Sequence, residues 1–195
     1  ARSISIEDGL RAIRERTLSV LGIRSPDPGR MVTLTCGAER ALPLLRDLPG
    51  YAALAADNGP SACIVSGDQR AVQTLLQRSM SEGIEAKVLP VSHGYHSQLI
   101  TSARPRYRAA LDSIRFQYPA LEFYSSITGN SIENLEIGDY PAHLESQFVE
   151  PVRLRQAVTA MHRRGVTLFV ECGPKWPLTT FISEILADQP HLSQP

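Results

Sequence analysis

Hydrophobic residues recur at helical spacing near the start of the chain. The apolar positions of this first face are Ile6, Leu10, Ile13, Thr17, Val20 and Leu21. Ser5 stands before two acidic residues, a combination typical of a helix N-terminus. The pattern therefore predicts an amphipathic helix that ends near Gly22, and the turn residues at 25–29 indicate a boundary after it.

The next segment alternates short apolar runs with runs of helical period. Strands are expected at 31–36, 51–56, 62–65 and 85–91, and helices at 39–48 and 69–83. This βαββαβ order is the split βαβ, or ferredoxin-like, arrangement. Because such a motif closes on itself within about sixty residues, we expect residues 30–91 to form an inserted small subdomain.

Beyond this segment the predicted units become longer. Ser97 is expected to cap a helix running to Ile114, which Pro105 should kink or split. The further expected elements are a strand at 121–128, helices at 143–148, 151–165 and 178–186, a strand at 167–171 and a frayed tail at 189–195. The uninterrupted apolar run of the last strand is typical of a central, buried parallel sheet. The sequence thus predicts a larger α/β subdomain made of residues 1–29 and 92–195.

Composition narrows the class of protein. With 195 residues, 43% of them hydrophobic, the chain can bury the core of one domain. The formal net charge is zero, and no block of like charge indicates nucleic acid or a membrane surface as a partner. Lys87 and Lys175 are the only lysines, so the positive charge is almost all arginine. This bias reflects either genome composition or a need for bidentate carboxylate binding.

The three cysteines, Cys36, Cys63 and Cys172, are far apart in the sequence and lie in apolar surroundings. An odd number at such spacing predicts reduced core thiols rather than a disulfide framework, and hence a cytoplasmic protein. No apolar run is long enough to span a bilayer, and the charged N-terminus is not a signal peptide. The cysteines are not paired for zinc, so no metal site is expected.

Candidate chemistry is concentrated in the hexapeptide Ser92–Ser97, which contains His93 and His96. It follows a strand-like run and precedes a helix start, so both imidazoles lie at the mouth of an α/β element. Histidine has the unperturbed pKa nearest neutrality, which makes this loop a candidate site for a general base. The alternative is that one is an exposed and the other a hydrogen-bonded loop histidine, neither with a function. The two have no third ligand at useful spacing, which disfavours a metal site.

Several short motifs carry a family resemblance in the same order along the chain. They occupy residues 5–11, 55–61, 65–68, 89–97, 126–129, 150–153 and 170–174. In this combination the chain resembles the malonyl-CoA:acyl-carrier-protein transacylases, and most closely the acyltransferase domains of polyketide synthases. The resemblance covers the C-terminal two-thirds of such a domain. It implies an α/β hydrolase-like large domain with a ferredoxin-like insert.

The resemblance also implies an activity. Family members move a malonyl extender unit from CoA, through an acyl-serine, to the phosphopantetheine thiol of an acyl carrier protein. The implied setting is polyketide, including antibiotic, biosynthesis. The implied partners are the carrier protein, the ketosynthase and the other domains of the same synthase. Malonyl-CoA is then a substrate, and no tightly bound cofactor is expected.

By resemblance, His96 matches the general base of the family, while His93 and Tyr95 match residues that shape the acyl pocket. An aromatic ring at position 95 fills the space that an α-methyl branch would need, which is typical of malonyl-type members. The alternative for Tyr95 is a packing aromatic. Gly94 stands where alanine is usual, a change that could loosen the loop.

Three further residues are assigned by the resemblance. Arg16 matches the guanidinium that holds the malonyl carboxylate with two parallel hydrogen bonds; helical periodicity alone does not choose between it and Arg14. Gln147 lies four residues before Pro151 and matches the position whose backbone carbonyl orients the catalytic histidine. Asn58 matches a turn near the active site, where a plain turn residue is the alternative.

No Gly-x-Ser-x-Gly motif occurs in these residues. In the family the nucleophile elbow lies shortly before the position that matches Ala1. We therefore expect the chain to begin downstream of the elbow and to need an N-terminal acyltransferase fragment bearing the serine and the oxyanion hole, without which it is inactive. Two alternatives are a non-catalytic, carrier-protein-docking relic of such a domain and a ligand-binding module built on the ferredoxin-like insert.

Overall fold

The computed structural model describes residues 3–173 and 175–194. Pro174 and Pro195, which belong to a sequence motif and to the expected tail, lie outside these ranges. The helices are α1 (Ile6–Leu21), α2 (Ala38–Leu44), α3 (Gln69–Ser81), η1 (Gln98–Ala103), α4 (Arg104–Leu111), η2 (Ile137–Asp139), α5 (Tyr140–Ser146), α6 (Leu154–Arg163) and α7 (Pro177–Ile185). The strands are β1 (Arg30–Leu34), β2 (Ala52–Gly59), β3 (Ala62–Gly67), β4 (Ala86–Val88), β5 (Tyr124–Ser125), β6 (Asn130–Ser131), β7 (Val152–Arg153), β8 (Leu168–Val170) and β9 (Leu192–Gln194).

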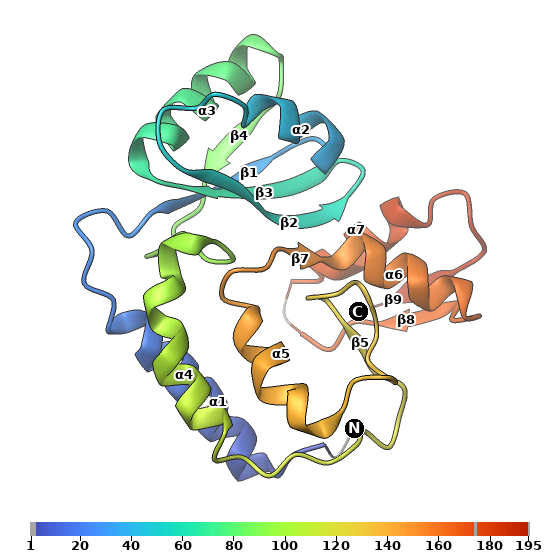
Figure 1. Ribbon diagram of the computed structural model, residues 1–195. Coiled ribbons are helices and arrows are strands. Elements are labelled where there is room, and N and C mark those ends of the chain that lie inside the picture. Colours follow the sequence, from blue (N-terminus) through green and yellow to red (C-terminus); the bar gives the residue numbers. More distant parts are fainter. Residues whose placement is uncertain (1–2, 174, 195) are drawn as a thin grey trace.

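A mixed five-stranded sheet of order β4-β1-β3-β2-β7 forms the upper part of the molecule (Figure 1). β1 is antiparallel to β3 and β4, and β2 is antiparallel to β3. Helices α2 and α3 pack on one face, over a core that includes Val32, Leu34, Ala41, Val65, Val72 and Leu75. The order of elements from β1 to β4 is the βαββαβ order that the sequence predicts for residues 30–91.

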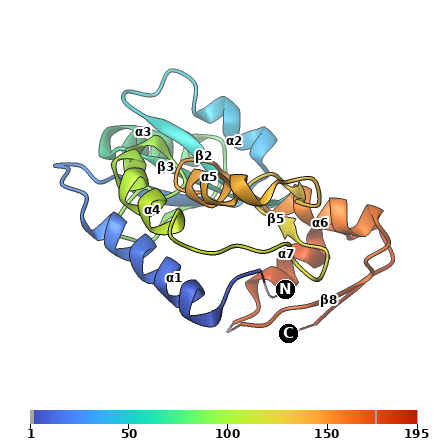
Figure 2. The same ribbon diagram turned by 60° about the horizontal axis from the view of Figure 1, so that its bottom comes forward.

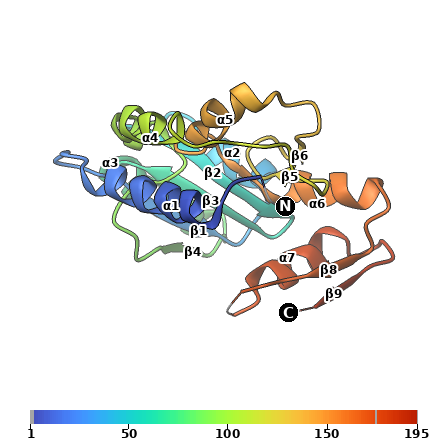
Figure 3. The same ribbon diagram turned by 90° about the horizontal axis from the view of Figure 1, so that it is seen from below.

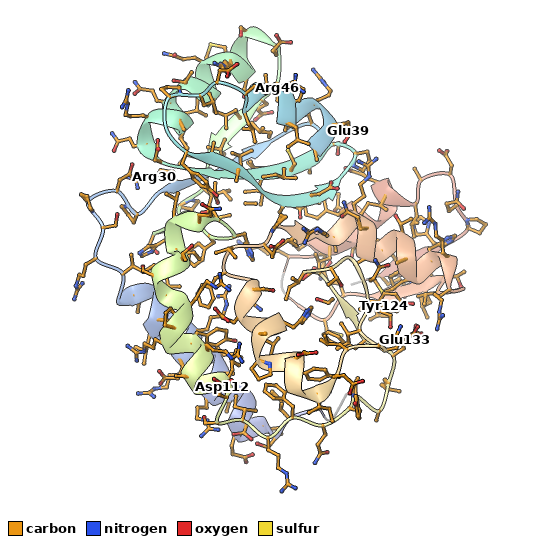
Figure 4. The ribbon with its side chains drawn as sticks, in the orientation of Figure 1. Arg30, Glu39, Arg46, Asp112, Tyr124 and Glu133 are labelled. Carbon is orange, nitrogen blue, oxygen red and sulfur yellow. The ribbon has the colours of Figure 1, made fainter. Side chains whose placement is uncertain are left out.

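The fifth strand connects this sheet to the rest of the chain. β7 runs parallel to β2, with Ala56 opposite Val152 and Asp57 opposite Arg153. Glu39 on α2, labelled in Figure 4, also accepts an ion-paired hydrogen bond at 3.1 Å from a guanidinium nitrogen of Arg155 on α6. Two kinds of contact thus join the segment after residue 150 to the small sheet.

Helices α1, α4 and α5 form a layer below the sheet (Figures 1 and 2). Its core includes Ile100, Leu111 and Phe148, each fully buried. The predicted effect of Pro105 is confirmed: the helix expected from residue 97 to 114 is split into η1, capped by Ser97, and α4, which has the proline in its first turn. Proline fits there because the first-turn N–H groups have no helical partner.

The N-terminal helix is where the sequence predicts it, capped by Ser5 and ending before Gly22. Most of its apolar stripe, however, faces outward. Ile6, Leu10 and Ile13 are 79%, 64% and 65% exposed. The buried residues of α1 are Ala12, Ser19 and Val20, and only Val20 belongs to the predicted stripe.

The C-terminal unit differs most from the sequence expectation. β8 pairs in parallel with β9, and α7 connects the two strands. The expectation that residues 167–171 form a central, buried strand is wrong: Leu168 and Val170 are 56% and 61% exposed, and among the described residues β9 is the sole partner of β8. The expected frayed tail contains strand β9. Figure 3 shows this unit projecting from the rest of the chain.

Three smaller expectations also need correction. The strand expected at 121–128 is reduced to the two residues of β5. The helix expected from Pro151 begins only at Leu154, because residues 152–153 are extended and pair with β2. Cys36 and Cys63 are buried free thiols as expected, but Cys172 is exposed. No helix within the described ranges has the length and apolar character needed to cross a membrane.

Candidate active site

The loop that contains the two histidines is fixed from several sides. The N–H of Gly94 donates to the carbonyl of Pro28 at 2.9 Å, and the N–H of Ser97 donates to the carbonyl of Phe148 at 3.0 Å. The hydroxyl of Ser66 on β3 donates to the carbonyl of Tyr95. The loop is therefore held by the small sheet and by the segment after α5 together. The Gly94 backbone takes part in this anchoring.

His96 has a left-handed backbone conformation, with φ of 55°. This conformation costs a non-glycine residue about 1–2 kcal/mol and persists where surrounding contacts over-determine it. The hydrogen bonds on either side of His96 supply such contacts. They direct the half-buried imidazole towards the chain that follows α5.

The Nδ1 atom of His96 lies 3.2 Å from the carbonyl oxygen of Glu150. A carbonyl can only accept, so Nδ1 carries the proton and the lone pair is on Nε2. Nε2 makes no hydrogen bond to the described residues. Burial lowers the pKa of His96; the carbonyls of Glu150 and Gln147 raise it, and the charge of Arg16 lowers it further. The ring is thus a neutral base with a free nitrogen near neutral pH.

The carbonyl expected to orient this ring was that of Gln147. The carbonyl within hydrogen-bond distance is that of Glu150, and Gln147 contributes a weaker backbone interaction. The reason is local: residues 147–149 form a turn after α5, in which the N–H groups of Val149 and Glu150 both donate to Ser146. This turn brings the carbonyl at its far end to the imidazole.

Arg16 lies beside the same histidine. Its Nε donates to the side-chain oxygen of Gln147 at 2.7 Å, and its guanidinium carbon is 5.5 Å from the ring centroid of Phe148. It is half-buried and forms no ion pair with any described residue. Arg14, in contrast, is exposed and paired with Glu15 at 2.7 Å. The structure thus distinguishes Arg16 from Arg14, which helical periodicity alone could not do.

His93 and Tyr95 lie in the same loop as His96. His93 is 9% exposed, and its Nδ1 lies 2.8 Å from the hydroxyl oxygen of Ser92. Burial lowers the pKa of His93. The rings of His93 and Tyr95 meet edge to face, 6.1 Å between centroids. Tyr95 is half-buried against the core of the helical layer, so its ring also has a packing role.

Asn58 lies in an irregularity of β2. The pairing register with β3 shifts between Asp57 and Gly59, which leaves Asn58 as the extra residue of a bulge. No side-chain hydrogen bond joins Asn58 to His96 or Arg16 within the described ranges. The structure therefore does not bring it into the cluster with these two residues.

Its neighbour Asp57 is a buried residue that the sequence analysis did not single out. It lines a polar cavity of about 430 Å³ beside Thr128, Gly129 and α6. One carboxylate oxygen accepts from Gln156 at 2.9 Å, and the other, Oδ1, has no partner among the described residues. Burial raises the pKa of Asp57. The sequence signal that could have identified Asp57 is a charged residue directly after the apolar run Ala52–Ala56.

A second, mostly apolar cavity of about 670 Å³ lies between the chain before α1 and helices α5 and α6. Ser125 and His143, both on its wall, are 2.8 Å apart between Oγ and Nε2. Burial lowers the pKa of His143. The sequence analysis missed this pair, because nothing in the spacing of the two residues indicates contact.

Within residues 3–173 and 175–194, no group of three or more histidine, cysteine, aspartate or glutamate side chains could hold a metal ion. The chemically distinct part of the molecule is therefore the cluster of His96, Arg16 and Gln147. It combines an oriented neutral imidazole with a half-buried guanidinium. Such a pair can accept a proton and bind an anion side by side.

Comparisons with known proteins identify related sequences. The model of a family described as acyl transferase domain matches residues 1–190. Erythronolide synthase EryA3 of Saccharopolyspora erythraea is 34% identical over 185 residues, which are 95% of this chain and 6% of the relative. The hybrid synthetase acdB of Aspergillus candidus is 32% identical over 85% of this chain and 6% of its own length.

Solved structures give the same picture. The acyltransferase domain from the second module of the salinomycin polyketide synthase has a TM-score of 0.87 and 27% identity, covering 98% of this chain and 44% of that one. The malonyl CoA-acyl carrier protein transacylase of Clostridium perfringens, at 22% identity, shows the fold alone, with a TM-score of 0.89 over 98% of this chain and 61% of that one. The chain therefore spans about half of such domains and a small share of the synthases.

Proposed function

Because this chain belongs to the acyl transferase domain family, we propose that it supplies the histidine and arginine half of an acyltransferase active site of polyketide synthase type. The reaction is the transfer of a malonyl group from CoA to the phosphopantetheine thiol of an acyl carrier protein. The observation that supports this most directly is the contact between His96 Nδ1 and the carbonyl of Glu150 at 3.2 Å. It leaves Nε2 as the free base, next to Arg16.

In the proposed mechanism, His96 Nε2 takes the proton of a serine hydroxyl that lies outside these 195 residues. The serine oxygen attacks the malonyl thioester, forms an ester and releases the CoA thiol, to which the imidazolium returns the proton. His96 then takes the proton of the phosphopantetheine thiol, whose sulfur attacks the ester carbonyl. The bond between the malonyl group and the serine oxygen breaks, and the imidazolium returns the proton to that oxygen. A covalent intermediate divides the transfer into two steps, each with one general base.

Arg16 is proposed to bind the free carboxylate of the malonyl group. The guanidinium is half-buried, has no carboxylate partner among the described residues, and stacks on Phe148. An incoming carboxylate would complete its hydrogen bonds in a charge-assisted pair. His93 and Tyr95 are proposed to shape the acyl pocket, with the Tyr95 ring disfavouring an α-methyl branch. Asn58 keeps its proposed place near the substrate on the resemblance alone.

We propose the ferredoxin-like description for residues 30–91, supported by the sheet order β4-β1-β3-β2. Residues 1–29 and 92–195 are proposed as part of a hydrolase-like large subdomain. The remaining part would bear the serine and cover the exposed apolar stripe of α1. The carrier protein and the ketosynthase of the same synthase are the proposed partners, by analogy with the synthases that the chain resembles.

The test uses this chain together with a segment that bears the family's serine elbow, as one domain. After mixing with malonyl-CoA, intact-mass measurement should show a malonyl adduct on the serine-bearing part, and then on a carrier protein added with its phosphopantetheine. Replacing the elbow serine by alanine is the control. No adduct, under conditions in which a complete acyltransferase domain is labelled, would indicate a docking relic instead.

A further inference from the structure

The side chain of Gln147 has a contact that a purely backbone role does not explain. Its amide oxygen accepts the N–H of Arg16 Nε at 2.7 Å. The orientation of the amide follows from chemistry, because a guanidinium has donors only. Gln147 is the residue that ends α5, and α5 is fixed to α4 by a 2.6 Å ion pair between Glu145 and Arg104. The amide is therefore presented from an anchored position.

The contact restricts how Arg16 can bind an anion. A guanidinium binds a carboxylate bidentately either through Nε and one Nη atom or through the two Nη atoms. Since Gln147 occupies Nε, only the second fork is left. Phe148 supports one face of the same group, with 5.5 Å between the guanidinium carbon and the ring centroid. Two neighbouring residues thus fix both the edge and the plane of the guanidinium.

We propose that Gln147 is a positioning residue that directs the Nη pair of Arg16 towards the carboxylate of the acyl group, and so sets the preference for carboxylated over uncharged acyl groups. This inference rests on the proposed function. It assigns a task to the side chain that differs from the interaction of the main chain of Gln147 with His96. The two tasks can be separated, because a substitution of the side chain leaves the carbonyl in place.

The test compares Gln147→Met with the unchanged protein in the domain that contains the serine elbow. Methionine keeps the length of the side chain but cannot accept the Nε hydrogen bond. Because a hydrogen bond to a charged group is involved, kcat/KM for malonyl-CoA should fall about tenfold, with most of the change in KM. The rate with acetyl-CoA, which has no carboxylate, should stay within about twofold. Gln117→Met, at an exposed position, is the matched control.

A double-mutant cycle with Arg16→Ala tests whether Gln147 acts through Arg16. In the Arg16→Ala background, Gln147→Met should have no further effect on the ratio of malonyl to acetyl transfer. Gln147→Glu should lower malonyl transfer more than Gln147→Met, because its carboxylate competes for the guanidinium. The acid limb of the pH profile should be the same for Gln147→Met as for the unchanged protein. A general disturbance of the site would shift this limb.

The outcomes separate the inference from the proposed function. If Arg16→Ala changes the malonyl to acetyl ratio and Gln147→Met does not, the inference is wrong and the proposed function stands. If neither changes the ratio, Arg16 does not bind the carboxylate and both fail. Equal losses with malonyl-CoA and acetyl-CoA in Gln147→Met would show a structural role only, and would overturn the inference.

Discussion

At the scale of single residues, the site depends on the surroundings of one imidazole. His96 is half-buried, donates through Nδ1 to a carbonyl and lies near a guanidinium. Burial is the largest influence on its pKa, which lies below the usual histidine value. Since a base must be neutral to accept a proton, these surroundings extend its working range to lower pH.

Arg16→Ala should raise the pKa of His96, because it removes a positive charge that disfavours the imidazolium. NMR titration of the ring in the 195-residue chain measures this directly. A pKa that stays the same or falls would contradict the placement of Arg16 beside His96.

Because the folded pKa of His96 is lowered, the neutral imidazole contributes stability above about pH 6.5. This contribution is lost as the pH falls through the folded pKa.

Asp57 should change stability with pH in the opposite direction to His96. Its pKa is raised by burial, so its contribution to stability is present below the ordinary aspartate pKa and lost as the pH rises through the folded pKa. Asp57→Asn keeps an acceptor for Gln156 and removes the buried charge. It should raise the free energy of unfolding by about 1 kcal/mol at pH 7 and by less at pH 4.

Urea unfolding at the two pH values makes the measurement, and Asp188→Asn, at an exposed position, is the control. A loss of stability at pH 7 would contradict the account of Asp57.

The loop histidines and the first helix were predictable because their signals are local. The burial of Asp57 and the choice of the Glu150 carbonyl were not, since both depend on how α6 and the turn after α5 pack against distant strands.

At the scale of elements, the small sheet followed the sequence closely. The signal there is the alternation of short apolar runs with runs of helical period, and each run lies within a few residues. The structure adds a cap at Asp68, whose side chain accepts from the N–H of Ala71 at the start of α3. The strands expected at 121–128 and 167–171 differ from the structure. Apolar runs say that a segment can be buried, but not which partner covers it. In β8 the partner is β9, from a segment expected to be a tail.

Asp68 is the helix cap whose removal should lower the free energy of unfolding most. Burial alone would raise its pKa, but N–H groups that include those of Ala71 and Tyr51 hold the pKa below the ordinary value. Asp68→Ala removes the acceptor of the Ala71 and Tyr51 bonds, at 2.8 and 2.6 Å, and should cost about 2 kcal/mol. Ser5→Ala removes one cap bond on α1 and should cost about 1 kcal/mol. Equal losses in thermal or urea unfolding would contradict the double role of Asp68.

At the scale of the whole molecule, apolar surface is exposed at the first helix and in the C-terminal unit. Ile6, Leu10 and Ile13 of α1 are more than half exposed, and so are Leu168 and Val170 of β8. Figure 3 shows where these two elements lie. Sequence patterns predicted that these segments are amphipathic or apolar. They could not show that no described element packs over Ile6, Leu10, Ile13, Leu168 and Val170. An exposed apolar surface of this kind fits the proposed interface with the serine-bearing segment.

The double substitution Leu10→Gln, Ile13→Gln tests that interface. Both side chains are at least 64% exposed, so the free energy of unfolding of the chain alone should change by less than about 0.5 kcal/mol. Co-purification with the serine-bearing segment should be strongly reduced. Met80→Gln, at an 82% exposed position on α3, is the control and should leave it unchanged. Undiminished co-purification of the double variant would contradict the proposed interface.

The most direct test of the central proposal is the rate of malonyl transfer from CoA to a carrier protein by the domain that includes the serine elbow, with and without His96→Ala. The account predicts that the substitution lowers the rate by about 10²–10⁴, while binding of malonyl-CoA is retained through Arg16. Transfer at the unchanged rate would show that His96 is not the base, and would contradict the account.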